Sequence, residues 1–229
     1  MESFSNAETM ESVCSGAPLD GDTLAAMSHV GGKTISSRYY HFIKRSFDLC
    51  FSFILGIILL IPMLIIALII KLDSPGPVLF RQERLGKCGR PFTMIKFRSM
   101  CVDAEKDGPK WADREDKRCT KFGRALRKSR LDELPQLWNI LIGNMSFVGP
   151  RPERACFYEE FDEYIPEFKH RLQVTPGLTG LAQINGGYEL KPEEKIVYDM
   201  YYIRNRSFRI DISCMFKTVT LMFTHEGAR

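Results

Sequence analysis

Two adjacent carboxylates, Asp132 and Glu133, have the residue types and the setting that suggest catalysis. The apolar residues after them recur at three- and four-residue intervals, as on the buried face of a helix: Leu134, Leu137, Trp138 and Leu141. We predict a helix that begins near Asp132, because a proline such as Pro135 is tolerated in the first helical turn. Both carboxylates would then lie at a helix N-terminus, where the helix dipole stabilises anions.

Basic residues flank this carboxylate pair on both sides. The upstream cations form a cluster, which consists of Lys121, Arg124, Arg127, Lys128 and Arg130. Downstream, Arg151 lies between Pro150 and Pro152. Carboxylates among cations favour a site that handles phosphate together with a divalent metal. A plainer alternative stays open, because acidic residues in a first turn often only cap the helix and a charged segment usually faces solvent.

Several motifs, in the same order, resemble the bacterial sugar transferase family. These are the monotopic polyprenyl-phosphate phosphoglycosyl transferases, which start glycan assembly on a lipid carrier. The motifs are KFRSM at 96–100, RLDELPQLWN at 130–139, GNMSFVGPRP at 143–152, PGLTG at 176–180 and DMYYI at 199–203. The resemblance covers the chain from about Tyr40 to its C-terminal end and leaves the first forty or so residues outside.

The resemblance implies a reaction. A sugar 1-phosphate would pass from a UDP-sugar to undecaprenyl phosphate, with release of UMP, as the first membrane step of exopolysaccharide, capsule, O-antigen or glycoprotein glycan assembly. Asp132 would be the nucleophile and would form a covalent aspartyl-phosphosugar intermediate. Glu133 would be an auxiliary carboxylate that assists metal binding or orientation. Both are the expected ligands of Mg²⁺, which prefers oxygen donors and neutralises phosphate charge.

Four cations are candidate phosphate-binding residues: Lys96, Arg98, Arg127 and Arg151. Lys96 and Arg98 are two residues apart on a predicted strand, so their side chains share one face. That face either holds a diphosphate or meets solvent. The two prolines fix the backbone around Arg151, and a fixed guanidinium suits bidentate phosphate binding, although a plain proline-rich turn is the alternative.

The segment from Leu49 to Ile70 carries no charged residue and is long enough to cross a hydrocarbon core of roughly 30 Å. Basic residues precede it and follow it, so the charges give no preferred crossing direction. Pro62 lies in mid-segment and removes a backbone hydrogen bond. A helix hinged at Pro62 that re-enters on one face accounts for both observations, and the resemblance implies the same. A kinked spanning helix is the alternative.

The remaining pattern predicts an α+β fold of helices around a small β-hairpin. Its strands are Val78–Glu83 and Pro91–Met100, and a charged loop with a single anchoring Trp111 follows at Val102–Cys119. The predicted helices are Lys121–Lys128, Glu153–Tyr164, Pro192–Arg204 and Asp211–Glu226. The apolar stripe of the last helix either packs in the core or lies in the membrane interface: Ile212, Met215, Phe216, Val219 and Met222.

Three parts are therefore expected: a disordered tail at 1–37, an interfacial and re-entrant membrane helix at 38–72, and a catalytic sugar-phosphate transferase domain at 73–229. The 229 residues carry a net charge of +4, seven cysteines and four histidines. No cysteine or histidine spacing matches a zinc site, and the cysteines are expected to be reduced. We expect the bacterial inner membrane as the location, with the catalytic domain on the cytosolic face.

The expected partners are the UDP-sugar, undecaprenyl phosphate and the membrane, with a homodimer and downstream glycosyltransferases as further candidates and no nucleic acid. Two other functions stay open from the sequence. A membrane-anchored adaptor would not need the intact Asp132–Glu133 pair, and a metal-dependent nucleotide-sugar hydrolase would have no use for the anchor. No residue identifies the sugar.

Overall fold

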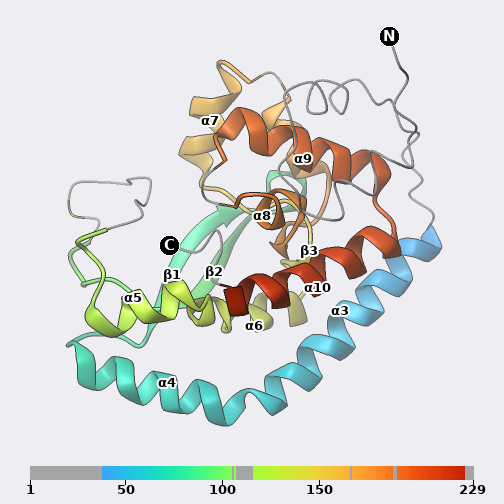
Figure 1. The fold of residues 1–229 in the computed structure, drawn as a ribbon. Coiled ribbons are helices and arrows are strands. Elements are labelled where there is room, and N and C mark those ends of the chain that lie inside the picture. The colour runs from blue at the N-terminus through green and yellow to red at the C-terminus, as the bar shows by residue number, and fades with distance from the viewer. Residues whose placement is uncertain (1–37, 105, 107–115, 166, 188–189, 225–229) are drawn as a thin grey trace.

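The computed structural model describes residues 38–104, 106, 116–165, 167–187 and 190–224. The predicted disordered tail at 1–37, Trp111 with most of its charged loop, and the predicted helix end at Glu226 lie outside the described residues. The fold mixes helices with two small two-stranded sheets, in agreement with the α+β prediction. A long bent helix pair runs along one side, and the hairpin and the shorter helices lie against it (Figure 1).

The bent pair consists of α3 (Arg38–Ile58) and α4 (Leu60–Asp73), whose axes differ by 61°. The break at Leu59 follows from Pro62, because the proline nitrogen carries no hydrogen for the carbonyl of Ile58 four residues earlier. Among the described residues, no single helix is long and apolar enough to cross a membrane, but this pair passes the same criteria jointly. The predicted hinge residue therefore lies at an observed bend.

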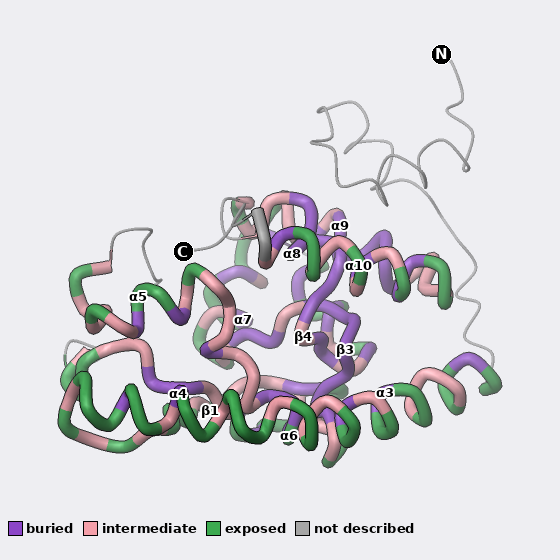
Figure 2. The backbone as a smooth tube through the Cα atoms, turned by 60° about the horizontal axis from the view of Figure 1, so that its bottom comes forward, coloured by how far each residue is buried: buried purple, intermediate pink, exposed green. Residues whose placement is uncertain are grey.

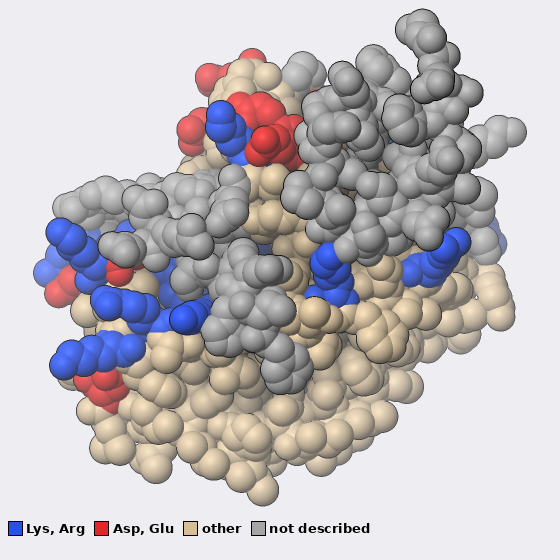
Figure 3. Space-filling model, viewed as in Figure 1, with Lys and Arg blue, Asp and Glu red and all other residues tan. Residues whose placement is uncertain are grey.

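Large apolar side chains are exposed along both helices of the pair. They include Phe53, Ile57, Ile61, Leu64, Leu68 and Leu72, each more than half exposed. The same stretch is exposed along most of its length in the burial view (Figure 2), and most of the surface over the pair is uncharged (Figure 3). A protein surface in water rarely exposes so large an apolar patch, so this side needs an apolar cover.

Two basic residues that precede the apolar segment, Lys44 and Arg45, contact other parts of the protein. Arg45 donates to the carbonyls of Ile140 and Leu141 at 2.7 and 2.8 Å, and Lys44 pairs with Asp211 at 3.0 Å. Both cations therefore hold α3 against the rest of the protein. Because these two cations have partners within the protein, the basic residues on both sides of the segment are weaker support for re-entry than they were from the sequence alone.

The predicted hairpin forms from β1 (Leu79–Leu85) and β2 (Pro91–Phe97), antiparallel around a short turn, η1 (Lys87–Gly89). The turn requires positive φ at Cys88 and Gly89. Beyond it come α5 (Lys121–Lys128), a 3₁₀ turn η2 (Leu131–Glu133) and α6 (Gln136–Leu141). Asn139 of α6 accepts from the backbone N–H of Ile95 and donates to the carbonyl of Thr93, which fixes α6 beside β2.

A second, parallel pair of strands completes the core, with β3 (Ser146–Val148) beside β4 (Gly177–Thr179). A side chain at Gly177 would come within 2.1 Å of the Gly149 nitrogen, so the two segments can approach this closely only with glycine. The remaining elements are α7 (Ala155–Asp162), η3 (Phe168–Gln173), α8 (Leu181–Ile184), α9 (Pro192–Asn205) and α10 (Phe208–Thr224).

The apolar residues of the last helix lie partly in the core and partly on the surface. Helix α10 buries Ile210, Cys214 and Leu221, whereas Ile212, Phe216 and Val219 are each more than half exposed. Core packing is thus the wrong explanation for those three exposed side chains. Their placement in a membrane interface stays a prediction.

Candidate active site

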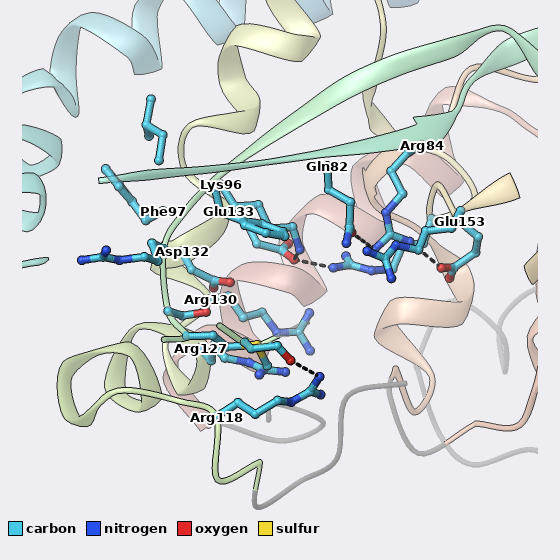
Figure 4. A pocket seen from close by; sticks show the side chains of 18 of the residues that line it. Gln82, Arg84, Lys96, Phe97, Arg118, Arg127, Arg130, Asp132, Glu133 and Glu153 are labelled. Carbon is cyan, nitrogen blue, oxygen red and sulfur yellow. Dashed lines mark hydrogen bonds and ion pairs between the residues drawn. The ribbon is translucent and has the colours of Figure 1, made fainter. Parts of the chain in front are cut away.

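One cavity of about 450 Å³ brings the predicted site residues together (Figure 4). Its walls come from the hairpin, from α5 and η2, and from the starts of α7 and α8. Cations outnumber carboxylates in its lining: Arg84, Lys96, Arg98, Arg118, Arg127, Arg130, Arg151, Arg154, Arg171 and Lys195 against Asp132, Glu133 and Glu153. A cavity with such an excess of positive charge attracts polyanions such as a nucleotide diphosphate.

The carboxylate pair does not lie at the N-terminus of a long helix, as the spacing suggested. Asp132 and Glu133 belong to η2, and α6 begins three residues later at Gln136. Arg130 adopts a left-handed conformation with φ of 58°, which starts the new turn and breaks the helical path from α5. The N-cap positions of η2 and α6 are Arg130 and Pro135, and neither makes a side-chain capping hydrogen bond, so capping does not explain the carboxylates. Trp138 is 56 % exposed, so it is not on the buried face.

Glu133 is held by two cations. Its Oε1 accepts from Lys96 Nζ at 3.0 Å and from Arg151 Nη2 at 2.5 Å. Burial opposes ionisation of this carboxyl, but the charges of Arg151 and Lys96 outweigh burial and hold its pKa well below the usual range. Glu133 is therefore ionised at neutral pH, and its carboxylate is in contact with two cations, Lys96 and Arg151.

Asp132 is different, although it is the next residue. It is 8 % exposed, and no hydrogen bond joins its carboxylate to another described residue. Burial raises its pKa to about 6, Lys96 opposes that rise, and the charge of Glu133 adds to it. A desolvated carboxylate without a hydrogen-bonding partner is more nucleophilic than a paired one, and its unused oxygens face a basic cavity.

The four predicted phosphate-binding cations have different surroundings. Lys96 and Arg151 converge on Glu133, and Arg127 lines the same cavity, where its Nη1 donates to the sulfur of Cys119 at 3.2 Å. Arg98 has another task. Its Nη1 donates to the carbonyl of Pro75, and its Nη2 donates to the carbonyl and hydroxyl of Ser74, where α4 ends. We therefore leave Arg98 out of the proposed phosphate site.

A buried ion pair that the sequence analysis missed supports Arg151. Arg171 donates from Nε to Asp199 Oδ2 at 2.7 Å and from Nη2 to the carbonyl of Arg151 at 2.9 Å. Both charged side chains are at most 2 % exposed, and the guanidinium lies over the rings of Phe168 and Tyr158. Asp199 falls within the DMYYI motif, and this motif was the one sign in the sequence that Asp199 matters. Nothing in the sequence indicates that its partner is Arg171.

Mg²⁺ commonly takes one or two protein carboxylates and fills its other positions with substrate phosphate and water. Among the described residues, no group of three His, Cys, Asp or Glu side chains is arranged to hold a metal ion. The Asp132–Glu133 pair still fits Mg²⁺ in this mode, because the Asp132 oxygens have no hydrogen-bonding partner among the described residues. A fully protein-enclosed metal site does not fit the described part of the chain.

The raised pKa of Asp132 gives a pH prediction. If the ionised carboxylate reacts, the rate of UMP release from a UDP-sugar without lipid should fall about tenfold per pH unit below pH 6. Without the lipid, no phosphate monoester of the acceptor titrates in the same range. Glu133→Gln should move this acid limb to lower pH, because it removes a negative neighbour and leaves Lys96 and Arg151 to stabilise the Asp132 anion. An unshifted limb would contradict the assignment.

A model of the bacterial sugar transferase family matches residues 39–225. The chain belongs to this family. It is 45 % identical over 202 residues to the UDP-N-acetylgalactosamine-undecaprenyl-phosphate N-acetylgalactosaminephosphotransferase of Aeromonas hydrophila, a match that covers 86 % of this chain and 48 % of the relative.

Two further bacterial sugar transferase relatives have nearly the same similarity. The UDP-glucose:undecaprenyl-phosphate glucose-1-phosphate transferase of Caulobacter vibrioides is 42 % identical over 192 residues, covering 81 % of this chain and 71 % of the relative. The exopolysaccharide production protein PSS of Rhizobium leguminosarum is 41 % identical over 192 residues, a match that covers 80 % of this chain and 96 % of the relative. The chain spans about half the length of the Aeromonas relative, and its family region contains every residue of the site described above.

Proposed function

We propose that this chain transfers a sugar 1-phosphate from a UDP-sugar to undecaprenyl phosphate and releases UMP. One observation carries the proposal: a buried carboxylate without a hydrogen-bonding partner among the described residues, Asp132, opens on a basic cavity beside a carboxylate that two cations hold. The printed names of the Aeromonas and Caulobacter relatives describe the same class of transfer to the same acceptor. The sugar and the pathway are not part of the proposal.

The proposed chemistry has two displacements at one phosphorus. The Asp132 carboxylate oxygen attacks the β-phosphorus of the UDP-sugar, and the bond to the bridging oxygen breaks, so that UMP leaves with that oxygen and the bond's electron pair. A phosphate oxygen of the lipid then attacks the same phosphorus, and Asp132 departs as a carboxylate. Lys96, Arg127 and Arg151 stabilise the charge on the transferred group, and Glu133 fixes two of these cations. Asp132 and Glu133 would hold Mg²⁺, which when bound would neutralise charge on the diphosphate.

A donor screen tests the proposed function. Purified full-length chain in detergent or nanodiscs should release UMP from at least one UDP-sugar, and undecaprenyl phosphate should be required for sustained turnover. Steady release of sugar phosphate without lipid would show a hydrolase instead. Absence of UMP release from every common UDP-sugar, with lipid and Mg²⁺ present, would refute the proposal.

Metal dependence is a separate prediction. We expect turnover to disappear in EDTA after exhaustive dialysis and to return with Mg²⁺, because charge on the diphosphate opposes attack by an anionic carboxylate. Sodium chloride at equal ionic strength is the control and should not restore activity. Full turnover in EDTA would mean that the cations of the cavity suffice.

We also propose that the bent helix pair enters and leaves the membrane on the cytosolic face, with the catalytic part outside the bilayer. The 61° bend and the exposed apolar side chains along α3 and α4 support this placement. Strand β2 and helix α5 both line the cavity and pack on α4 through Phe97 and Leu126, so Asp132 would lie close to the membrane that α4 enters.

Pro62→Leu tests the hinge. Leucine restores a hydrogen-bond donor for the carbonyl of Ile58, so α3 and α4 should straighten and a crossing helix should place the N-terminal side of the membrane segment outside. Cysteine probes near Arg38 and near Lys87, in a background without native cysteines, report the topology in intact cells. Met63→Leu, the neighbouring control, should keep both probes protected from an external reagent. A wild-type probe near Arg38 that reacts from outside while the one near Lys87 does not would contradict re-entry.

A further inference from the structure

A third carboxylate of the cavity, Glu153, is hydrogen-bonded through only one of its oxygens. Its Oε2 accepts from Arg84 Nη1 at 2.8 Å, in an ion pair of two largely buried side chains. No hydrogen bond joins Oε1 to a described residue. Glu153 is 8 % exposed, and Oε1 is not among the enclosed side-chain atoms that lack a partner, so Oε1 keeps accessible surface where the residue lines the cavity. A ligand in the cavity can therefore reach this oxygen.

Glu153 is held in place through both its side chain and its backbone. Arg84 also donates from Nη1 to the carbonyl of Pro152 at 3.2 Å and from Nη2 to Gln82 Oε1 at 2.5 Å. The backbone N–H of Leu85 donates to the carbonyl of Glu153 at 3.0 Å. Gln82, Arg84 and Glu153 consequently lie together on one side of the cavity (Figure 4). The position of the Oε1 atom is thus set by strand β1.

This side of the cavity is separate from the carboxylate pair. Lys96 contacts Glu133, and the strand register places Lys96 opposite Phe80 of β1. Arg84 is four residues further along β1, about 13 Å at the rise of a strand. A long substrate whose phosphates lie near Lys96 can therefore place another of its groups near Glu153.

A ring hydroxyl is the ligand group that suits the free oxygen of Glu153. An ionised carboxylate accepts hydrogen bonds and donates none, and it repels phosphate. A hydroxyl is a neutral donor, and its hydrogen bond to a carboxylate is shorter and stronger than one to a neutral acceptor. Mg²⁺ suits the oxygen less well, because the positive charge of Arg84 already lies on the same carboxylate. A nucleotide sugar carries ring hydroxyls on both sides of its diphosphate, on the ribose and on the sugar.

We propose that Glu153 Oε1 accepts a hydrogen bond from a ring hydroxyl of the donor substrate. This inference rests on the proposed function, because it takes a UDP-sugar as the ligand. The hydroxyl belongs to the ribose or to the sugar, and binding measurements separate these two sources. Glu153 is then a binding residue that takes no part in bond making, and Arg84 positions it.

Binding to purified full-length protein in detergent tests the proposal, with UMP, 2′-deoxy-UMP, 3′-deoxy-UMP and pyrophosphate as ligands. UDP-glucose and UDP-N-acetylgalactosamine are added in an Asp132→Asn background, which should bind these donors without consuming them. Glu153→Gln retains a carbonyl oxygen for Arg84 and replaces the free oxygen by an NH₂ group. We expect this variant to bind the hydroxyl-bearing ligand at least about fivefold more weakly. Pyrophosphate has no ring hydroxyl, so its binding should stay unchanged or become tighter, because a negative charge is lost.

Two further variants serve as controls. Glu153→Asp keeps the charge but withdraws the oxygen by one methylene group, so it should weaken binding of the same ligand and leave pyrophosphate binding unchanged, even if Glu153→Gln fails to fold. Glu159→Gln, the same substitution at an exposed position of α7 outside the cavity, should bind every ligand as wild type does.

The pattern of losses identifies the hydroxyl. Weaker UMP binding by Glu153→Gln, together with a wild-type preference for UMP over one deoxynucleotide that shrinks in the variant, assigns Glu153 to the ribose. Unchanged UMP binding with weaker binding of a UDP-sugar assigns Glu153 to the sugar. Either result supports the proposal.

Other outcomes would overturn the inference. Unchanged binding of every ligand by the Glu153 variants, with a wild type that releases UMP from a UDP-sugar, would refute it and leave the proposed function standing. Equal weakening for every ligand, pyrophosphate included, would indicate a structural effect on the neighbouring Arg151. Weakening that appears only with Mg²⁺ present would make Glu153 a metal ligand. Wild type that binds no uridine nucleotide at all would refute the proposed function together with this inference.

Discussion

Asp132→Asn should lose at least about a thousandfold in turnover, because an amide cannot form the acyl phosphate that the proposed first displacement requires. The structure removes the main competing explanation. If Asp132 were a helix cap, asparagine would replace it at little cost, but the N-cap residues of η2 and α6 are Arg130 and Pro135. Turnover is measured as UMP release with UDP-sugar, undecaprenyl phosphate and Mg²⁺ present.

The same variant should not lose stability at neutral pH. Burial raises the pKa of Asp132 to about 6, above the value near 4 of an unfolded aspartate, so the ionised carboxylate destabilises the fold above pH 6. Asparagine removes that charge, and the melting temperature at pH 7.5 should be equal to or above that of wild type. The difference should shrink as the pH falls from 6 towards 4, because wild-type Asp132 then takes up a proton.

A labelling experiment separates the nucleophile from a metal ligand. A UDP-sugar labelled in the β-phosphate should leave label on wild-type protein, and polyprenyl phosphate should remove it. Asp162→Asn is the matched control, since it changes a surface carboxylate outside the cavity, and it should take up label as wild type does. Near-normal turnover by a verified Asp132→Asn protein would sink the nucleophile assignment. Lost turnover with no label ever trapped on wild type would favour a direct displacement.

Local patterns predicted the elements well wherever local forces decide them. The basic helix Lys121–Lys128 has its predicted ends, and the strands around Gly86–Gly89 lie where apolar alternation and turn residues place them. Pro62 predicted a bend because the missing N–H acts within one helical turn. The carboxylate pair was found from its setting, but its helix was misplaced, since the left-handed Arg130 breaks the path between α5 and η2.

Long-range partners could not be predicted in the same way. Arg45 belongs to the basic flank of the predicted membrane segment, and Arg98 was a predicted phosphate-binding residue. Both donate instead to carbonyls near the ends of α6 and α4, residues 140–141 and 74–75. A helix end offers several unpaired carbonyls, and any nearby arginine can satisfy them. Sequence spacing does not say which arginine the fold brings there. The Arg171–Asp199 pair could not be predicted either, because its members are 28 residues apart and only the fold brings them together.

Among the ion pairs of the described residues, Arg171–Asp199 should be the most costly to break. Arg171→Met leaves a fully buried carboxylate without its cation, which typically costs about 3–5 kcal/mol. Burial already raises the pKa of Asp199 and Arg171 opposes that rise, so the loss of Arg171 should raise the pKa further. Thermal unfolding of Arg171→Met should therefore show a large deficit at pH 8 that shrinks at lower pH, where Asp199 binds a proton in the fold.

The double variant Arg171→Met with Asp199→Leu separates stability from catalysis. Removing both charges should recover most of the lost stability, because a buried pair adds little over apolar residues of similar volume. Activity should not recover with it: the carbonyl of Arg151 loses the hydrogen bond from Arg171 Nη2, and a less fixed Arg151 should lower kcat/KM by about ten- to a hundredfold. Lys169→Met with Asp162→Leu, an exposed pair on the surface, is the control and should change neither quantity appreciably. A double Arg171–Asp199 variant with wild-type kcat/KM would show that the buried pair only holds the fold together and does not position Arg151.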